Sequence, residues 1–316
     1  MKKEILSIVV PCYNESETTE SSFRILQQLC NSWKEKTLIA DYELLFVNDG
    51  STDDTFDILK KIYNKNKNVS IVNLRKNSGF QAALTAGLFE STGDIVVSID
   101  ADLQDDPEKI EEMIQKYHEG FEMVLGIRKD RSTDTFFKRL FAETYYKILR
   151  KIGVKSVYNH GDFRLLSRGI IDDLKKFPER VRYLRSLIFE IEPRYACVYY
   201  ARTKRKFGQS KFTFSKSLSL AIDGVTSFTA QPIRLLSVLG FFMFILSIVC
   251  TVIVFFGKFY WHLGIPGWAS LALIVLFFGG IQNLSLGVVG EYVSKIYIEN
   301  KARPLYLVRD IYTHGK

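Results

Sequence analysis

The chain has 316 residues, of which 47% are hydrophobic and 14% aromatic, a composition that excludes a disordered or fibrous chain and suffices for one large domain with an appendage. Lysines and arginines exceed the acidic residues by eight, so an anionic partner has to be considered. We expect a phosphorylated substrate or a lipid headgroup and no nucleic acid, because no nucleic-acid motif is present and much of the basic charge lies near apolar segments.

The first part of the chain alternates short β-rich runs with helical stretches. Strands are expected at 6–10, 44–47, 70–74, 95–99 and 123–127, and helices near 17–31, 54–64, 80–91, 108–118 and 134–152. This alternation predicts an α/β fold with a mainly parallel sheet. The strands are apolar almost throughout, which indicates that helices cover both faces of the sheet.

The N-terminus and the cysteines both indicate a protein that faces the cytosol. Pro11 ends the apolar run of MKKEILSIVVPCYNE too soon for a secretory signal, so this stretch is expected to be the first core strand. The four cysteines form no CxxC pair and no cluster with histidine; they are Cys12, Cys30, Cys197 and Cys250. Neither a zinc site nor a disulfide framework is indicated, and we expect reduced thiols.

Polar residues follow each of the first four expected strands, in the stretches PCYNE, NDGST, RKNSG and DADLQDD. Ligands of such sheets bind outside the carboxyl ends of the strands. The residues expected to gather there are Asp49, Asn77, Asp100 and Asp102. These residue types are also common in ordinary turns, and that alternative stays open for each single loop. The motifs GxGxxG and GxxxxGK[ST] are absent, which excludes the usual dinucleotide and P-loop phosphate cradles.

Asp100 and Asp102 form the strongest candidate metal site. Residues two apart in an extended backbone point to the same side, with α-carbons roughly 6.5 Å apart, so the two carboxylates can converge on one cation. Such oxygen ligands suit Mg²⁺ or Mn²⁺ shared with substrate phosphates, and Gln104 could add an amide oxygen. Asp105 and Asp106 are expected to cap the following helix. A solvated turn is the alternative for Asp100 and Asp102.

Two uncharged segments near the C-terminus predict membrane-spanning helices. Residues 235–257 and 268–290 each match the roughly 20 residues that a helix needs to cross a bilayer, and apolar side chains cover every helical face. A buried hairpin in a soluble core is the alternative. The outer flanks are basic, whereas the connection at 258–266 has a single lysine, so both termini are expected in the cytoplasm.

The motifs, taken in order, resemble a known family. VVPCYNE, VNDGSTDDT and DADLQDDPE resemble the GT-A fold of family 2 glycosyltransferases, in the branch that moves a sugar from a nucleotide onto a polyprenyl phosphate. GDFRLLSR, RKFGQSKF and DGVTSFTAQPIRL, followed by two apolar segments, resemble the bacterial bactoprenol-phosphate glucosyltransferases, relatives of dolichol-phosphate mannose synthase. The likeness covers nearly the whole chain. Asp106 departs from it, because relatives usually have proline there, and no loss of metal binding is expected.

The resemblance implies roles for residues after the strands. The nucleotide sugar would be held by Pro11, Tyr13, Glu15, Asp49, Asn77 and Asp100, and the Mg²⁺ or Mn²⁺ ion by Asp100 and Asp102 with help from Gln104. From the residues alone, Tyr13 could equally be a core aromatic. Asp102 would be catalytic through the metal.

Asp162, expected on a loop that faces the acidic stretch, is implied as the general base of an inverting displacement. A phosphate monoester has a second pKa of about 6 and hardly needs deprotonation at neutral pH. Orientation of the acceptor or the sugar is therefore the alternative role for Asp162. His160 is the other candidate base, and a structural histidine is its alternative.

Two basic clusters are candidates for binding the lipid phosphate, because arginine recognises phosphate with a planar fork. They consist of Arg128 and Arg131 after the fifth strand, and of Arg202, Arg205, Ser210 and Lys211 around a flexible Phe-Gly-Gln stretch. Related enzymes use matching arginines and close the second loop over the site. A solvated basic face is the alternative.

The expected organisation is a cytosolic GT-A domain at 1–211, an amphipathic juxtamembrane helix at 212–231, two transmembrane helices at 232–291 and a cytosolic tail at 292–316. The juxtamembrane helix is expected to lie at the membrane interface. A second amphipathic stretch at 137–148 either lies on the membrane or packs on the sheet.

The expected function is transfer of glucose, or N-acetylglucosamine, from a UDP-sugar to undecaprenyl or another polyprenyl phosphate in the cell membrane. The lipid-linked monosaccharide would serve cell-envelope glycosylation, with self-association, a downstream flippase and a second glycosyltransferase as expected partners. A processive polysaccharide synthase is one alternative, although it would need more spans and a QxxRW motif. A non-catalytic membrane module that senses nucleotide is the other.

Overall fold

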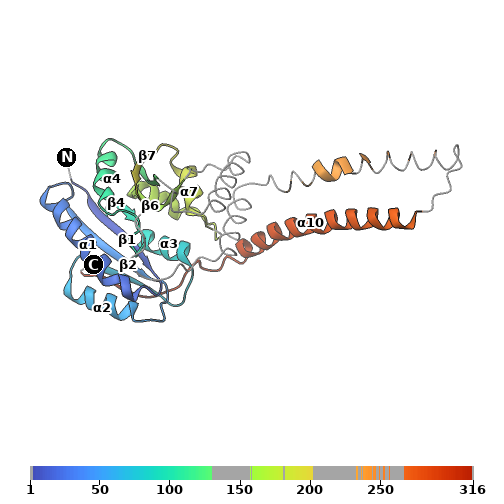
Figure 1. The fold of residues 1–316 in the computed structure, drawn as a ribbon. Coiled ribbons are helices and arrows are strands. Elements are labelled where there is room, and N and C mark those ends of the chain that lie inside the picture. The colour runs from blue at the N-terminus through green and yellow to red at the C-terminus, as the bar shows by residue number, and fades with distance from the viewer. Residues whose placement is uncertain are drawn as a thin grey trace. The chain divides into compact units, whose positions relative to one another are not determined.

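The computed structural model describes residues 3–129, 157, 159–180, 182–201 and 267–314, together with scattered positions between 233 and 256. The chain divides into two compact units. One comprises Met1–Ser219 with Arg303–Lys316, and the other comprises Leu220–Ala302. The first unit contains the sheet that positions the candidate site (Figure 1).

Eight strands within the described ranges form one sheet, in the order β7-β5-β6-β4-β1-β2-β3-β8. The strands are β1 (Ile5–Cys12), β2 (Asp41–Asn48), β3 (Val69–Leu74), β4 (Ile95–Ser98), β5 (Met123–Arg128), β6 (His160–Ser167), β7 (Ala196–Tyr200) and β8 (Val308–Tyr312). The central strands β4, β1, β2 and β3 are parallel, and β7 is parallel to β5. β6 and β8 run antiparallel to their neighbours. The sheet is therefore mainly parallel with antiparallel additions, as the sequence predicted.

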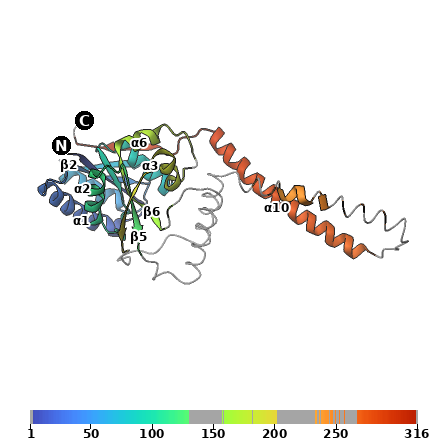
Figure 2. The same cartoon turned by 90° about the horizontal axis from the view of Figure 1, so that it is seen from above.

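Helices cover both faces of the sheet. The helices of this unit are α1 (Ser16–Glu35), α2 (Thr55–Lys65), α3 (Phe80–Glu90), α4 (Lys109–His118), α6 (Arg168–Lys175) and α7 (Leu184–Ile191). Side chains of α1, α2 and α4 join one core cluster with alternate strand residues such as Ile8 and Val97. α3 packs on the other face, where a Cβ on Gly87 would lie 2.3 Å from a methyl carbon of Val9. α3 also contacts α6 there (Figure 2).

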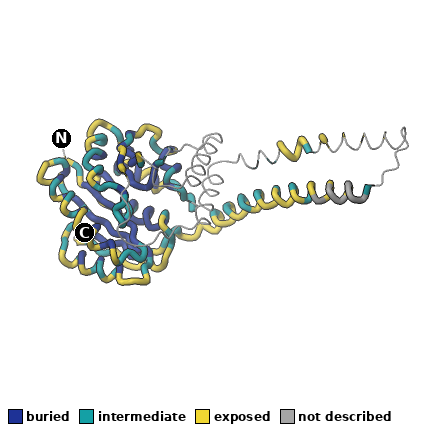
Figure 3. Tube along the Cα trace, in the orientation of Figure 1, coloured by how far each residue is buried: buried dark blue, intermediate teal, exposed yellow. Residues whose placement is uncertain are grey.

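The strands owe their burial to continuous apolar sequence. Every residue of β3 and β4 is buried, and β1 is buried from Leu6 to Cys12, which is the pattern of a sheet covered on both sides (Figure 3). The expected strands at 6–10, 44–47, 70–74, 95–99 and 123–127 are confirmed as β1 to β5. The expected helices in between are confirmed as α1 to α4, while the one at 134–152 and the stretch at 137–148 lie outside the described residues.

The structure corrects one assignment and adds two strands. The segment that begins HGDFRLLS, expected as a loop, is strand β6, and all eight of its residues are buried. β7 and β8 were not predicted from the sequence. Cys12, Cys30 and Cys197 are free thiols, and Cys250 lies outside the described residues.

The second unit contains α10 (Trp268–Asn300), a helix of 33 residues. It runs ten residues beyond the end of the expected span at 268–290. Many of its large apolar side chains are exposed (Figure 3). Within the described residues, no helix combines the length and the apolar character that crossing a membrane requires. Eleven of the 23 positions of the expected span at 235–257 and the whole amphipathic stretch at 212–231 lie outside them.

Candidate functional site

The candidate site lies where the parallel strands end. β1 lies between β4 and β2, so the chain leaves β1 toward β2 on one side and reaches β4 on the other. A parallel sheet opens a crevice at such a switch point, outside the carboxyl ends of the strands. β6 runs antiparallel to β4 and therefore begins at this same end. We call this region the carboxyl end of the sheet.

The nucleotide candidates lie on the loops that follow β1, β2 and β3. Pro11 is buried in β1, opposite Val47 of β2, while Tyr13 and Glu15 are half-buried in the loop that follows. Asn77 is exposed between β3 and α3. The structure thus brings these loops to one end of the sheet, as the sequence predicted.

Asp49 connects two of these loops. Its side chain is buried, and its two carboxylate oxygens accept the backbone N–H groups of Ser78, at 2.7 Å, and Gly79, at 3.0 Å. Burial raises the pKa of Asp49 and these two hydrogen bonds act against it. The loop that carries Asn77 is therefore held by Asp49, the first residue after β2.

Asp100 is the centre of an acidic cluster after β4. Burial raises its pKa to about 7. The neighbouring carboxylates that add to this effect are those of Asp105, Asp162 and Asp102, in decreasing order, and the Arg128 cation acts against it. These neighbouring carboxylates disfavour the charged form of Asp100, and a cation held beside Asp100 would favour it.

Gln104 stays close to the metal candidates, since its backbone N–H donates to Oδ1 of Asp102 at 3.2 Å. Asp105 does not have its expected role as a helix cap. It is buried and accepts hydrogen bonds from the Tyr200 hydroxyl at 2.7 Å and from Nη2 of Arg128 at 3.2 Å. Asp106 instead accepts the Glu108 N–H just before α4. The reason is position, because Asp105 faces the partly buried Arg128 and the buried Tyr200.

Arg128 ends β5 and is held in place from two sides. Besides its contact with Asp105, its Nε donates to the Tyr200 hydroxyl at 3.2 Å. The side chain remains about a quarter exposed, at 26%. A Cβ on Gly161 would lie 3.4 Å from Nη2 of Arg128, an ordinary van der Waals distance, so Gly161 lies against the guanidinium. Arg128 thus lies beside the acidic cluster.

Asp162 is bound by two arginines. Nη2 of Arg164 lies 2.6 Å from Oδ1, and Nε and Nη2 of Arg185 lie 3.1 and 2.7 Å from Oδ2. Burial alone would raise the pKa of Asp162, but the two guanidinium groups outweigh it and hold the pKa well below its usual range. A carboxylate with so low a proton affinity is a poor general base.

His160 is no better as a base. Burial, with the nearby Arg164 and Arg185 cations, lowers its pKa well below the ordinary value. Its Nε2 is buried and has no hydrogen-bond partner among the described residues. The neutral imidazole packs edge-on against the Phe189 ring, with the ring centres 6.0 Å apart. The structural interpretation of His160 is the one that these contacts favour.

Sequence reasoning missed several members of this site: Arg164, Arg185, Tyr200 and the inward role of Asp105. A signal existed for Arg164, because it lies two residues after Asp162 and strand residues two apart point the same way. Arg185 is 23 residues away on α7, and no local pattern connects it with Asp162.

The other predicted acceptor residues, Arg131, Arg202, Arg205, Ser210 and Lys211, lie outside the described residues. In the part of the chain that is described, no group of three or more His, Cys, Asp or Glu side chains is arranged to hold a metal. The proposed site has two carboxylates, and Mg²⁺ commonly completes such a set with water and substrate phosphates. The acidic cluster around Asp100 therefore fits a divalent ion that arrives with a diphosphate.

Comparisons with known proteins identify the family of this chain. A family model described as glycosyl transferase family 2 matches residues 7–175. The uncharacterized glycosyltransferase YkoT of Bacillus subtilis (strain 168) is 42% identical over 307 residues, which cover 96% of this chain and 91% of that protein. The bactoprenol glucosyl transferase of Shigella phage SfX is 36% identical over 305 residues, covering 96% of this chain and 98% of that protein.

Among solved structures, the mannosyltransferase PcManGT from Pyrobaculum calidifontis, in complex with GDP-Man and Mn²⁺, is 18% identical with a TM-score of 0.45. That match covers 65% of this chain and 59% of the other. The family model spans more than half of the chain, and the relatives match it over nearly its whole length. This chain is accordingly a glycosyltransferase with a GT-A fold, and it belongs to glycosyl transferase family 2.

Proposed function

We propose that this enzyme transfers a hexose, glucose in the first instance, from a UDP-sugar to a polyprenyl phosphate in a membrane. Relatives named bactoprenol glucosyl transferase, 34–36% identical over nearly the whole chain, support glucose and the lipid acceptor. The structural observation that carries the proposal is the cluster at the carboxyl end of the sheet. There the carboxylates near Asp100, suited to a metal-bound diphosphate, lie within electrostatic reach of Arg128, suited to a second phosphate.

On the donor side, the loops after β1, β2 and β3 would hold the base and ribose, with Tyr13, Glu15 and Asp49 as the principal side chains. Asp100 and Asp102, assisted by Gln104, would hold Mg²⁺ or Mn²⁺ on the diphosphate. When bound, this ion neutralises part of the charge on the departing diphosphate. Burial first, and then the neighbouring carboxylates, raise the pKa of Asp100, so a cation held there would favour its ionised form.

On the acceptor side, Arg128 is positioned by Asp105 and Tyr200 to bind the lipid phosphate. That phosphate is mostly ionised at neutral pH, so its oxygen attacks the anomeric carbon without a general base and inverts that carbon. Asp162 then has a positioning role, because its carboxylate holds Arg185 and Arg164 at the edge of the site. The residues outside the described ranges that complete this side are proposed to be Arg131, Arg202, Arg205, Ser210 and Lys211.

We also propose that the chain is anchored in the cell membrane by two helices, at 235–257 and 268–290, with the catalytic domain and both termini in the cytoplasm. The uncharged sequences of these segments support it. So do the exposed apolar side chains of α10, which include Leu271, Ile274, Val275, Phe277, Leu284 and Leu286. An anchored enzyme meets a water-soluble donor and a lipid acceptor at the same interface.

The test is acceptor-dependent release of nucleoside diphosphate by the purified full chain with Mg²⁺ or Mn²⁺. UDP should appear with UDP-glucose only when polyprenyl phosphate is added, and more slowly with UDP-N-acetylglucosamine. Release that is equally fast without the lipid would overturn the proposed acceptor. An absence of release with either donor, while the nucleotide still binds, would favour a non-catalytic sensor.

A further inference from the structure

The end of the chain returns to the sheet. β8 pairs antiparallel with β3, from Ile71 opposite Tyr312 to Leu74 opposite Val308. It becomes the outermost strand next to β3, on the side of the sheet away from β7. β8 therefore begins at the carboxyl end of the sheet, where β3 ends.

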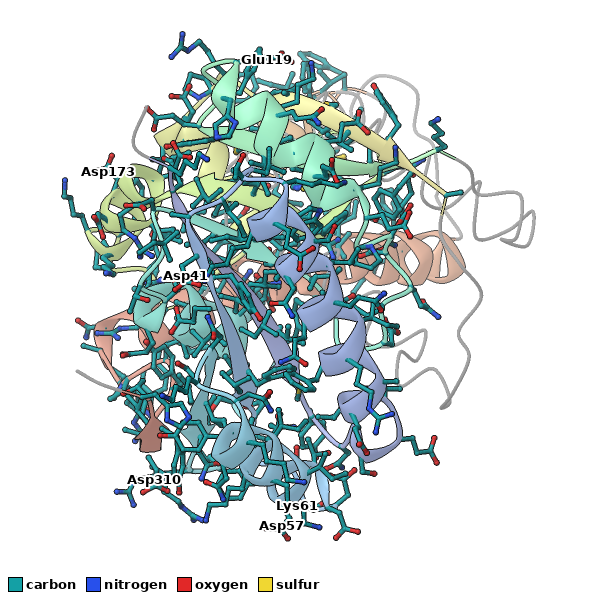
Figure 4. The ribbon with its side chains drawn as sticks, turned by 90° about the vertical axis from the view of Figure 1, so that its left-hand side faces the viewer. Asp41, Asp57, Lys61, Glu119, Asp173 and Asp310 are labelled. Atoms are coloured by element: carbon teal, nitrogen blue, oxygen red, sulfur yellow. The ribbon has the colours of Figure 1, made fainter. Side chains whose placement is uncertain are left out.

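Aromatic contacts fasten β8 to α2. The Tyr312 ring lies 6.1 Å from that of Phe56 and 5.7 Å from that of Tyr63, centre to centre. The His314 ring stacks on Tyr63 at 4.0 Å, and the Tyr63 hydroxyl donates to the backbone oxygen of Thr313 at 3.0 Å. Figure 4 labels Asp310 on β8 together with Asp57 and Lys61 of α2 at the same end of the domain. This strand is thus firmly packed.

One connection leads from β8 to the donor loops through the backbone. The Arg75 N–H donates to the carbonyl oxygen of Leu307 at 2.9 Å, just before β8. Arg75 is the first residue after β3, and it begins the loop whose Ser78 and Gly79 N–H groups bind Asp49. The backbone hydrogen bonding between β3 and the C-terminal segment therefore extends by one bond into the loop that carries the nucleotide candidate Asn77.

A second connection runs through two asparagines in the sheet. Nδ2 of Asn73 lies 3.4 Å from Oδ2 of Asp310, and Nδ2 of Asn48 donates to Oδ1 of Asn73 at 2.8 Å. Oδ1 of Asn48 accepts the Ser51 N–H at 3.2 Å, and the Ser51 hydroxyl accepts the Asn14 N–H at 3.0 Å.

Both asparagines are only 3% exposed. Burying an amide side chain is costly unless its hydrogen bonds are made, so each member of this chain depends on the next. The chain ends beside Tyr13, in the loop after β1 that we assign to the nucleotide. Asp310 on β8 is thereby coupled to a residue neighbouring the donor site.

We propose that β8 is part of the donor half of the site and that its contacts set the positions of the loops after β1, β2 and β3. This inference rests on the proposed function for the identity of the donor. The alternative is that β8 only covers an otherwise open sheet edge, which proteins commonly protect. In that case its contacts would affect overall stability and not the donor loops in particular.

Tyr312→Ala removes the aromatic packing, and Asp310→Ala, at an exposed position, removes the acceptor of the Asn73 amide. Ile311→Ala is the matched control, because its side chain is 45% exposed on the same strand. Asp310→Asn retains an acceptor oxygen and should restore the wild-type behaviour. All variants are made in the full chain.

The first measurement is amide hydrogen exchange without substrate. The Ser78 and Gly79 amides should exchange faster in Tyr312→Ala and Asp310→Ala than in Ile311→Ala, while amides of β5 keep their wild-type rates. The second is kinetic: Tyr312→Ala should raise KM for the nucleotide sugar about three- to tenfold, the size of one aromatic pair, and leave KM for the lipid phosphate unchanged.

The role of β8 would be overturned if the Ser78 and Gly79 amides exchange at the wild-type rate in both Tyr312→Ala and Asp310→Ala. It would also be overturned if amides throughout the sheet exchange faster by the same factor as these two. The exchange result does not depend on turnover. If the wild-type chain transfers no sugar, the proposed function is refuted. The amide-exchange rates of the variants would then still decide the role of β8.

Discussion

At the scale of single residues, Asp162 shows how its neighbours limit what a carboxylate can do. Its oxygens are bound by Arg164 and Arg185, and these cations keep its pKa low although burial acts in the opposite direction. A group with a depressed pKa stays ionised at every pH above its unfolded value of about 4, so nothing at this position titrates near neutrality. This argues for positioning and against proton transfer.

Replacing Asp162 with Asn tests that role through the pH profile. Asp162→Asn removes the negative charge between two arginines and should lower the transfer rate. Because Asp162 does not titrate near neutrality, the ratio of wild-type to variant rate should stay constant from pH 6 to 9. A ratio that grows with pH through this range would instead identify proton abstraction. Near-wild-type unfolding temperature of the variant is the control for folding.

The metal assignment is tested at Asp102. Asp102→Asn removes one anionic ligand and should reduce transfer by about a hundredfold or more, since a Lewis acid contributes several kcal/mol to such a step. Asp106→Asn makes the same chemical change four residues away, where the side chain only accepts the Glu108 N–H, and it should retain activity. Substantial Mn²⁺-dependent turnover by Asp102→Asn would refute the assignment.

At the scale of the elements, β5 and β7 jointly position Arg128, the arginine that we propose binds the acceptor phosphate. The Tyr200 hydroxyl, at the end of β7, accepts from Arg128 of β5 and donates to Asp105. Without this hydroxyl, Arg128 would keep its charge but lose one of the groups that fix the orientation of its guanidinium. Phosphate binding by a guanidinium depends on that orientation as well as on charge.

Tyr200→Phe should therefore raise KM for the lipid phosphate about tenfold or more, the value of one hydrogen bond to a charged group, and leave KM for the donor unchanged. Steady-state kinetics with each substrate varied in turn provide the measurement. Tyr199→Phe, on the neighbouring residue with a half-exposed side chain, is the control. Equal increases in both KM values would show that Tyr200 supports the whole site.

The strands also show how much of this fold can be predicted from the sequence. β1 to β5 are continuous apolar runs and were predicted within a few residues. β6 carries His160, Asp162 and Arg164, all buried, and buried charges break the pattern by which strands are recognised. β8 is a five-residue strand with exposed central residues, so only its pairing with β3 defines it. The structure places the predicted residues that follow apolar strands at one end of the sheet, whereas Arg185, which comes from α7, was not predicted.

At the scale of the whole molecule, the proposed membrane anchor can be tested at α10. The full chain should stay with membranes after an alkaline carbonate wash. Val275→Arg places a charge near the middle of the proposed span, which costs about 2.5–3.5 kcal/mol for a central arginine, and should weaken that retention. Val293→Arg, beyond the proposed span and also exposed, should be retained like the wild type. Complete release of the wild type would contradict the anchor.

The central claim for the whole enzyme is that the carboxyl end of one sheet brings a metal-bound diphosphate and a lipid phosphate together. Mass spectrometry of the lipid made from UDP-glucose and polyprenyl phosphate by the purified full chain tests it most directly. The account predicts one hexose on each lipid phosphate and one UDP formed for each hexose transferred. Lipids that carry longer glycans, or UDP formed without any glycosylated lipid, would contradict it.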